Sequence, residues 1–137
     1  PETPALLRSL VARDGLADSV TFLEGISDAS ATLRDADICV VPSREEGFGL
    51  VIVEAMAADV PVVASRLDGP AELIVPGLTG ELAEAGNADD FARKIAGLLA
   101  DRPRASPMMR QARAVARAHH IATMRDAYLA LYRSLAE

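Results

Sequence analysis

Two carboxylates in one short stretch are the side chains of this sequence best suited to chemistry. Glu46 and Glu54 are separated by seven residues, and Glu54 is the only charged residue in the apolar run 50–58. A helix that is apolar all round is a buried one, and a buried carboxylate is costly unless it is hydrogen-bonded. The two hydroxyl groups of a ribose could donate to Glu54. A backbone cap or an ion pair with an arginine would satisfy it equally well.

The elements around the two carboxylates place them at a strand–turn–helix junction. The apolar run 38–41 ends at a proline and predicts a strand buried on both faces of a parallel sheet. A polar turn over residues 43–49 and a helix over residues 50–58 follow. Ligands bind at such junctions in open α/β sheets, where the first helix amides are unpaired. Gly47 and Gly49 have no Cβ, so a ligand could approach the backbone closely.

The stretch that contains both glutamates is similar to a known family. It reads A-D-I-C-V-V-P-S over residues 36–43, E-G-F-G-L-V-I-V-E-A-M-A over residues 46–57 and V-P-V-V-A-S over residues 60–65. These strings resemble the retaining, family 4 type glycosyltransferases of GT-B architecture, whose C-terminal, donor-binding domain carries a Glu-x7-Glu motif. That motif alone is a weak signal, but within this context it is strong. The similarity runs from about residue 16 to the end of the chain.

The resemblance implies a role for each residue of the motif. Glu54 would accept hydrogen bonds from the ribose 2′- and 3′-hydroxyls of a nucleotide-diphosphate sugar. Glu46, the catalytic candidate, would lie beside the transferred sugar, where it hydrogen-bonds hydroxyls or stabilises positive charge at the anomeric carbon. The other donor-binding candidates are Gly47, Phe48, Gly49 and Leu50 at the helix N-terminus, where the dipole favours phosphate, and Glu24 and Gly25, which would flank the base. Transfer would retain the anomeric configuration and need no cofactor and no metal.

Two aspartates depart from the pattern of the resembled family. Asp59 and Asp68 occupy positions at which the family usually has glycine. An acidic side chain at position 68 would lie near the donor phosphates and oppose binding by like-charge repulsion. Glu72, which matches the family further downstream, is interpreted as structural.

A second acidic pattern, Asp35-Ala36-Asp37, matches the D-x-D motif by which another glycosyltransferase architecture holds a divalent cation. It precedes a predicted core strand, so it should lie at the end of the sheet opposite to the ligand edge. We interpret it as structural and assign no metal site.

The remaining elements alternate between strands and helices. Helices are expected over residues 4–14, 28–34, 70–75, 90–100, 107–118 and 121–136, and strands over residues 20–23, 60–64 and 80–83. The expected helix caps are Thr3, Ser27 or Asp28, and Asp89. Gly15 should end the first helix, and residues 101–107 should break the chain between two helices. This alternation predicts an α/β fold, a doubly wound, Rossmann-like parallel sheet. With the resemblance, it implies a single nucleotide-sugar-binding domain over residues 1–137. That domain would be an incomplete C-terminal half of a two-domain GT-B enzyme. It would lack its N-terminal strand and helix and the acceptor domain, so the isolated chain should be inactive.

Composition limits the classes of partner. A formal net charge of −6 and a pI near 4.9 argue against nucleic acid, and no apolar run approaches the roughly 18 residues of a membrane span. The single cysteine, Cys39, is expected to be an inert core thiol, which fits a cytoplasmic protein.

Arg110, Arg113 and Arg117 form a stripe that is interpreted as a solvated face. Contact with another domain, or with acidic lipid at the inner face of a membrane, is the functional alternative. His119 and His120 are interpreted as structural.

Three other functions remain open. The chain could be a nucleotide-sugar-binding module without catalysis, a sugar-nucleotide epimerase of GT-B architecture, or an α/β interaction domain with a coincidental motif. The residues do not specify the sugar, the base or the acceptor, which could be a glycan, a lipid or a small molecule.

Overall fold

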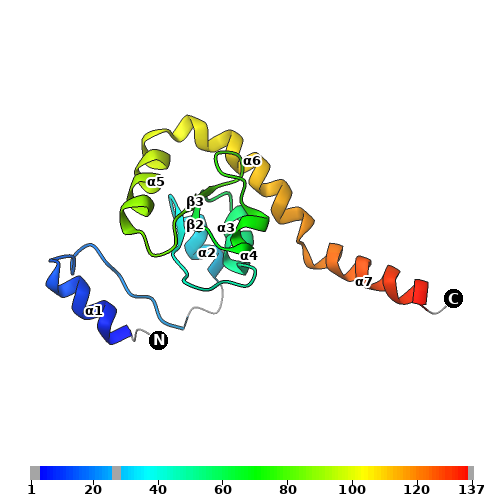
Figure 1. Cartoon of the computed structure of the whole chain (residues 1–137), viewed down its shortest axis with the longest axis horizontal. Helices are drawn as coiled ribbons and strands as arrows, with labels where there is room; N and C mark the ends of the chain where they lie inside the picture. Colours follow the sequence, from blue (N-terminus) through cyan, green and yellow to red (C-terminus); the bar gives the residue numbers. More distant parts are fainter. Residues whose placement is uncertain (1–3, 26–28, 136–137) are drawn as a thin grey trace.

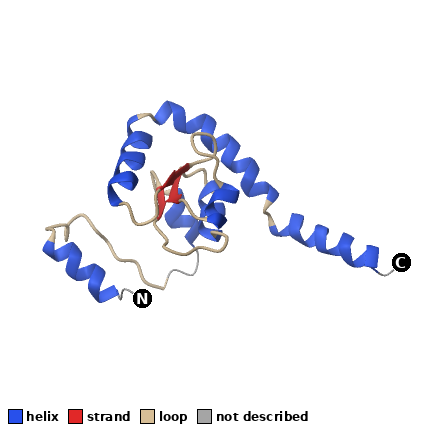
Figure 2. Cartoon of the chain, viewed as in Figure 1, coloured by secondary structure: helices blue, strands red, loops and turns tan. Residues whose placement is uncertain are grey.

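A parallel sheet forms the centre of the molecule. The computed structural model describes residues 4–25 and 29–135, and within these ranges the strands β1 (Cys39–Val41), β2 (Val62–Ser65) and β3 (Glu81–Ala83) lie in the order β1-β2-β3. Val40 pairs with Val63, and Val63 pairs with Glu81, all in parallel register. Figure 2 shows this short sheet enclosed by helices. The predicted parallel α/β fold is confirmed.

Helices lie on both faces of the sheet and at its two sides (Figure 1). In chain order they are α1 (Pro4–Arg13), α2 (Ala29–Arg34), α3 (Leu50–Ala57), α4 (Asp68–Leu73), α5 (Ala88–Ala100), α6 (Arg102–Ala118) and α7 (Ile121–Leu135). Figure 1 shows α1 and α7 projecting from opposite sides of the compact part. Neither of these two helices has a buried residue, so the core is built from the elements between them.

The core consists of two clusters, one on each face of β2. Alternate residues of a strand point to opposite faces. Val62 and Ala64 accordingly pack against α2, α3 and α6, and Val63 packs against α5 and the start of α6. The completely buried residues of α3 are Ile52, Ala55 and Met56. The predicted core strand and central helix are therefore confirmed, with boundaries that differ by one or two residues.

Two predictions about strands are wrong. Residues 20–23 form no strand, because a strand needs a neighbour for its backbone hydrogen bonds and no described strand pairs with this segment. The strand β1 is not buried on both faces. Val40 is 39% exposed, and Cys39 is only partly buried, because a pocket between β1 and α5 leaves Val40 uncovered.

The helices near the C-terminus also differ from the prediction. Asn87 caps α5, because its side-chain oxygen accepts a hydrogen bond from the amide of Asp90, so the cap predicted at Asp89 is wrong. The predicted break over residues 101–107 is confined to Asp101, which ends α5, and α6 begins at Arg102 and continues through Pro107. The next residue, Met108, is buried with Leu98 of α5, and this packing outweighs the local cost of proline. The caps predicted at Thr3, Ser27 and Asp28 lie outside the described residues.

The end of α3 explains one departure from the resembled family. Asp59 has a φ of 61°, in the left-handed region that glycine adopts most readily. The amide of Val60 donates to the carbonyl of Ala55 at 2.9 Å, as in a Schellman motif. Aspartate tolerates this conformation better than most residues, and its carboxylate pairs with Arg113 of α6. Of the arginine stripe, therefore, Arg113 joins α6 to the end of α3.

No helix in the described residues is both long enough and apolar enough to cross a bilayer.

We expect the ion pair between Asp59 and Arg113 to contribute about 0.2–1 kcal/mol to the free energy of unfolding, because both side chains are more than a third exposed. A double-mutant cycle with Asp59→Asn and Arg113→Gln, followed by urea unfolding, measures this coupling. Asparagine keeps the tolerance for positive φ. Arg110→Gln provides the control, since Arg110 is exposed on the same helix and should show no coupling to Asp59. A coupling of zero for Arg113 would contradict the assignment.

Candidate functional site

The turn between β1 and α3 lies at the carboxyl end of the sheet. Glu46, in this turn, is partly buried, and the hydroxyl of Ser43 donates to its Oε2 at 3.4 Å. Gly49 precedes α3 with a φ of 95° and a ψ of 59°, and no side chain caps this end of the helix. A Cβ at position 49 would lie 2.7 Å from Cδ1 of Ile52. Glycine is therefore required here by both conformation and space.

The amino end of α3 is available to an anion. Within the described residues, the amides of Phe48, Gly49 and Leu50 make no hydrogen bond, as expected where a helix begins. The Cα of Gly47 faces open space, since a Cβ added there would have no atom within 4 Å. Backbone donors, the helix dipole and an open approach together suit a phosphate or another anionic group.

The backbone of this turn rests directly on α4. A Cβ on Gly69 would lie 2.6 Å from the carbonyl oxygen of Gly47 and 2.8 Å from the amide nitrogen of Phe48. Contacts this short leave no room for any side chain at position 69. Sequence reasoning did not indicate that Gly69 supports the central turn, because the contact joins segments that are distant in the chain.

Glu54 lies on the exposed side of α3. The prediction that it is buried is wrong, because the side of α3 that carries Leu50 and Glu54 is uncovered and Leu50 is 71% exposed. A shallow pocket of about 180 Å³ at this carboxylate is lined by Arg34, Glu54, Ala57 and Ala58. Glu54 is four residues into the helix, a rise of about 6 Å from its first residue. Its carboxylate is thus open to a ligand.

Glu54 affects the thiol of Cys39 in β1. Burial raises the pKa of Cys39, and the negative charge of Glu54 raises it further, since both effects disfavour the thiolate. The expectation of an unreactive thiol at neutral pH fits this direction, although the side chain is only partly buried.

The loop predicted to flank the base lies after α1. Glu24 is exposed, and its carboxylate pairs with Arg8 at 2.6 Å, while the guanidinium of Arg8 lies 4.5 Å from the centroid of the Phe22 ring. Gly25 has a φ of 65°. Figure 1 shows α1 and the segment after it beside the compact part. The role of Glu24 and Gly25 stays a prediction.

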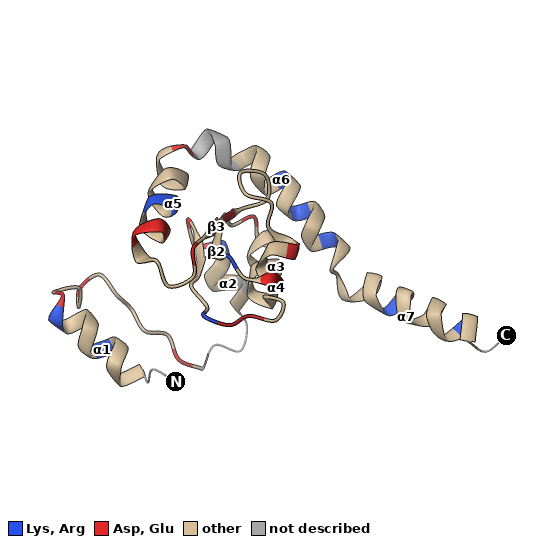
Figure 3. Cartoon of the chain, in the orientation of Figure 1, with Lys and Arg blue, Asp and Glu red and all other residues tan. Residues whose placement is uncertain are grey.

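Charge around the turn is mixed. Asp68 is exposed in the first turn of α4, where the helix dipole favours a carboxylate. Arg44 in the turn and Arg66 after β2 are the nearest cations in the sequence. Figure 3 marks acidic positions along the ribbon of the compact part, whereas the charged residues in the described part of α6 are all arginines. An anionic ligand at the turn would therefore depend on backbone amides as much as on side-chain charge.

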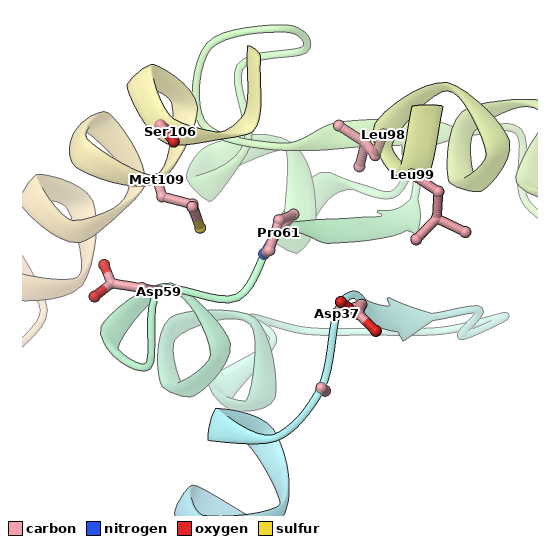
Figure 4. A pocket seen from close by; sticks show the side chains of 8 residues that line it. Asp37, Asp59, Pro61, Leu98, Leu99, Ser106 and Met109 are labelled. Carbon is pink, nitrogen blue, oxygen red and sulfur yellow. The ribbon is translucent and has the colours of Figure 1, made fainter. Parts of the chain in front are cut away.

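Two further pockets are lined by other residues than the two glutamates. One, of about 450 Å³, opens between β1 and α5 and is lined by Val40, Arg44, Phe91 and Ile95, among others. The other, of about 290 Å³, lies at the amino ends of β1 and β2 and includes Asp37, Asp59 and Pro61 (Figure 4). The D-x-D motif thus lies at the end of the sheet that the sequence predicted. The described residues contain no group of three or more metal-ligating side chains.

Comparison with known proteins agrees, over most of the chain, with the family that the motif around Glu46 and Glu54 resembles. A family model described as "Glycosyl transferases group 1" matches residues 1–101. D-inositol 3-phosphate glycosyltransferase 2 of Catenulispora acidiphila is 42% identical over 98 residues, covering 70% of this chain and 23% of that protein. The lipopolysaccharide core biosynthesis mannosyltransferase LpcC of Rhizobium leguminosarum bv. viciae is 42% identical over 95 residues, covering 69% of this chain and 27% of that protein. The chain therefore spans about a quarter of the length of these relatives.

Solved structures agree on the fold. Sucrose-phosphate synthase from Thermosynechococcus elongatus superposes with a TM-score of 0.88 at 34% identity, over 94% of this chain and 33% of that chain. HepE of Anabaena, solved with UDP, superposes with a TM-score of 0.88 at 29% identity, over 93% of this chain and 36% of that chain.

We expect Gly69→Ala to lower the free energy of unfolding by about 1–3 kcal/mol, the usual cost of inserting a methyl group into close-packed structure. Gly97→Ala is the matched control. Gly97 lies in α5 with nothing within 4 Å of an added Cβ, so alanine there should stabilise the protein by about 0.5–1 kcal/mol. Urea unfolding measures both variants. Equal stability of Gly69→Ala and the unmodified chain would show that the turn does not rest on α4.

Proposed function

The chain belongs to the group 1 glycosyl transferases, and we propose that it supplies the donor site of a retaining enzyme that transfers a glycosyl unit from a nucleotide-diphosphate sugar to an acceptor. The observation that carries this proposal is the turn before α3. Its unbonded amides and a partly buried carboxylate lie at the carboxyl edge of a parallel sheet, the usual ligand edge of such sheets.

Each group of the turn has a task in the proposed reaction. The amides of Phe48, Gly49 and Leu50 donate hydrogen bonds to the diphosphate, and the dipole of α3 stabilises its negative charge as the nucleoside diphosphate leaves. Glu46 lies beside the transferred sugar, where its carboxylate stabilises positive charge that develops at the anomeric carbon. Ser43 orients this carboxylate through its hydroxyl.

The nucleoside lies on the other side of the helix terminus. Glu54 accepts hydrogen bonds from the two ribose hydroxyls, a task that its exposure allows. Glu24 and Gly25 flank the base. Support for such a donor comes from HepE, which has been solved with UDP and with UDP-glucose. The proposed transfer involves no metal ion.

We further propose that acceptor binding requires a second domain, because the chain spans only about a quarter of its relatives. A cytoplasmic protein with peripheral contact at the inner face of a membrane is the proposed setting. One relative is named for lipopolysaccharide core biosynthesis, and this name supports the proposed setting.

We expect Glu54→Gln to weaken nucleoside diphosphate binding by about 1–3 kcal/mol, because a hydrogen bond to a charged group contributes that much. Calorimetric titration with UDP, GDP and ADP measures the effect. Glu45→Gln is the control, since Glu45 is an exposed carboxylate in the same turn and lies outside the motif. Unchanged affinity in a folded Glu54→Gln variant would exclude Glu54 from the ribose site.

For Glu46→Ala we expect turnover of the complete enzyme to fall at least about tenfold, within the range that a single electrostatic or acid–base group contributes. Affinity for the nucleoside diphosphate without sugar should stay the same, because Glu46 is assigned to the sugar. Glu45→Ala should change neither quantity, and a chelator should also change neither. An equal loss of turnover and nucleotide affinity would make Glu46 part of the nucleotide pocket instead.

A further inference from the structure

The joint between α6 and α7 contacts the candidate site through one aromatic pair. The ring of His119 lies 5.4 Å from the ring of Phe48, centroid to centroid, with an angle of 54° between the planes. This separation is within the range in which aromatic pairs attract each other. Nδ1 of His119 lies 2.9 Å from the carbonyl oxygen of Val115. Since a carbonyl can only accept, this nitrogen donates, and the bond fixes the orientation of the ring.

Two contacts determine how α6 lies along α3. Arg113 pairs with Asp59, just after the end of α3, and His119 contacts Phe48, just before its start. The two helices are therefore antiparallel. The small side chains of α6 that pack in the same cluster as α3 are Ala112, beside Arg113, and Ala116, and both are buried.

The central turn is thus held from two sides. Gly69 of α4 supports the peptide between Gly47 and Phe48, and His119, just after the end of α6, packs on the Phe48 side chain. The neighbouring histidine has a different task. Nδ1 of His120 accepts a hydrogen bond from the amide of Ala122 at 3.2 Å and caps the start of α7, so the two side chains can be separated by mutation.

We propose that His119 is a positioning residue of the donor site. It acts through Phe48, whose position keeps the turn over residues 46–49 in the conformation that presents its amides and the Glu46 carboxylate to the donor. This inference rests on the proposed function. It also couples the site to the α6–α7 joint, because a change in the joint moves the ring that contacts Phe48.

Amide hydrogen exchange of the chain, followed by NMR, tests the structural half of the proposal without a ligand. The amides of Ile52 and Val53 donate to the carbonyl of Gly49 at 2.9 and 3.4 Å, whereas the amide of Val60 donates to Ala55 at the other end of α3. We expect His119→Ala to reduce protection at Ile52 and Val53 about two- to tenfold, the change that corresponds to losing an aromatic pair. Protection at Val60 should not change.

Two further variants serve as controls. His119→Phe keeps an aromatic ring and should restore protection at Ile52. His120→Ala removes the cap of α7 and should affect the amide of Ala122 alone. Equal losses at Ile52 in His119→Ala and His120→Ala, or a uniform loss that includes Val60, would overturn the proposal.

Titration with UDP, GDP and ADP tests the functional half. For the nucleotide that binds, His119→Ala should weaken affinity about two- to tenfold, and His119→Phe should bind like the unmodified chain. Unchanged affinity in a variant whose turn has loosened would refute the role of His119 at the donor site. If the unmodified chain bound none of the three, the proposed function would fail, and the exchange data would still decide whether His119 holds the turn.

Discussion

The structure depends on one close approach between two backbones. Gly69, in the first turn of α4, lies so near the Gly47 carbonyl that a methyl group there would be 2.6 Å from the oxygen. This contact limits how the turn can lie relative to α4. Gly49, with its positive φ, then directs the chain into α3. Gly69 is needed because there is no space for a side chain, and Gly49 is needed mainly because of its backbone conformation. Together they position the unbonded amides at the start of α3 at the ligand edge.

The helix α3 packs against several other elements. Its buried side packs on β1 and β2, and α6 lies along it between Arg113 and His119. Its remaining side, with Glu54, stays open to solvent. One helix therefore joins the core, the C-terminal helices and the candidate donor site. Stability and site geometry are coupled here, because changes in the packing of α6 alter the end of α3 at which the donor would bind.

Exposure of the site follows from the same arrangement. The face of α3 that carries Glu54 and the free edge of β1 with Val40 are both uncovered in the described chain. A carboxylate exposed to water carries little desolvation penalty, and ligand hydroxyls can replace its hydrating water molecules. A buried carboxylate would need a hydrogen-bond partner within the protein. Exposure of Glu54 thus suits a residue that meets its ligand from solvent.

Local sequence signals determined the elements that depend on neighbouring residues. The apolar runs and the Gly-containing turn placed α3, β2 and β3 within one or two residues, and the motif around Glu46 and Glu54 indicated the family. The sequence could not determine contacts between distant segments. Continuity of α6 through Pro107 depends on Met108 packing against α5. Residues 20–23 form no strand because no strand of the described residues pairs with them. The support of the turn by Gly69 and His119 joins segments that are 20 or more residues apart. Periodicity and local propensity carry no information about such pairs, so only the tertiary structure decided them.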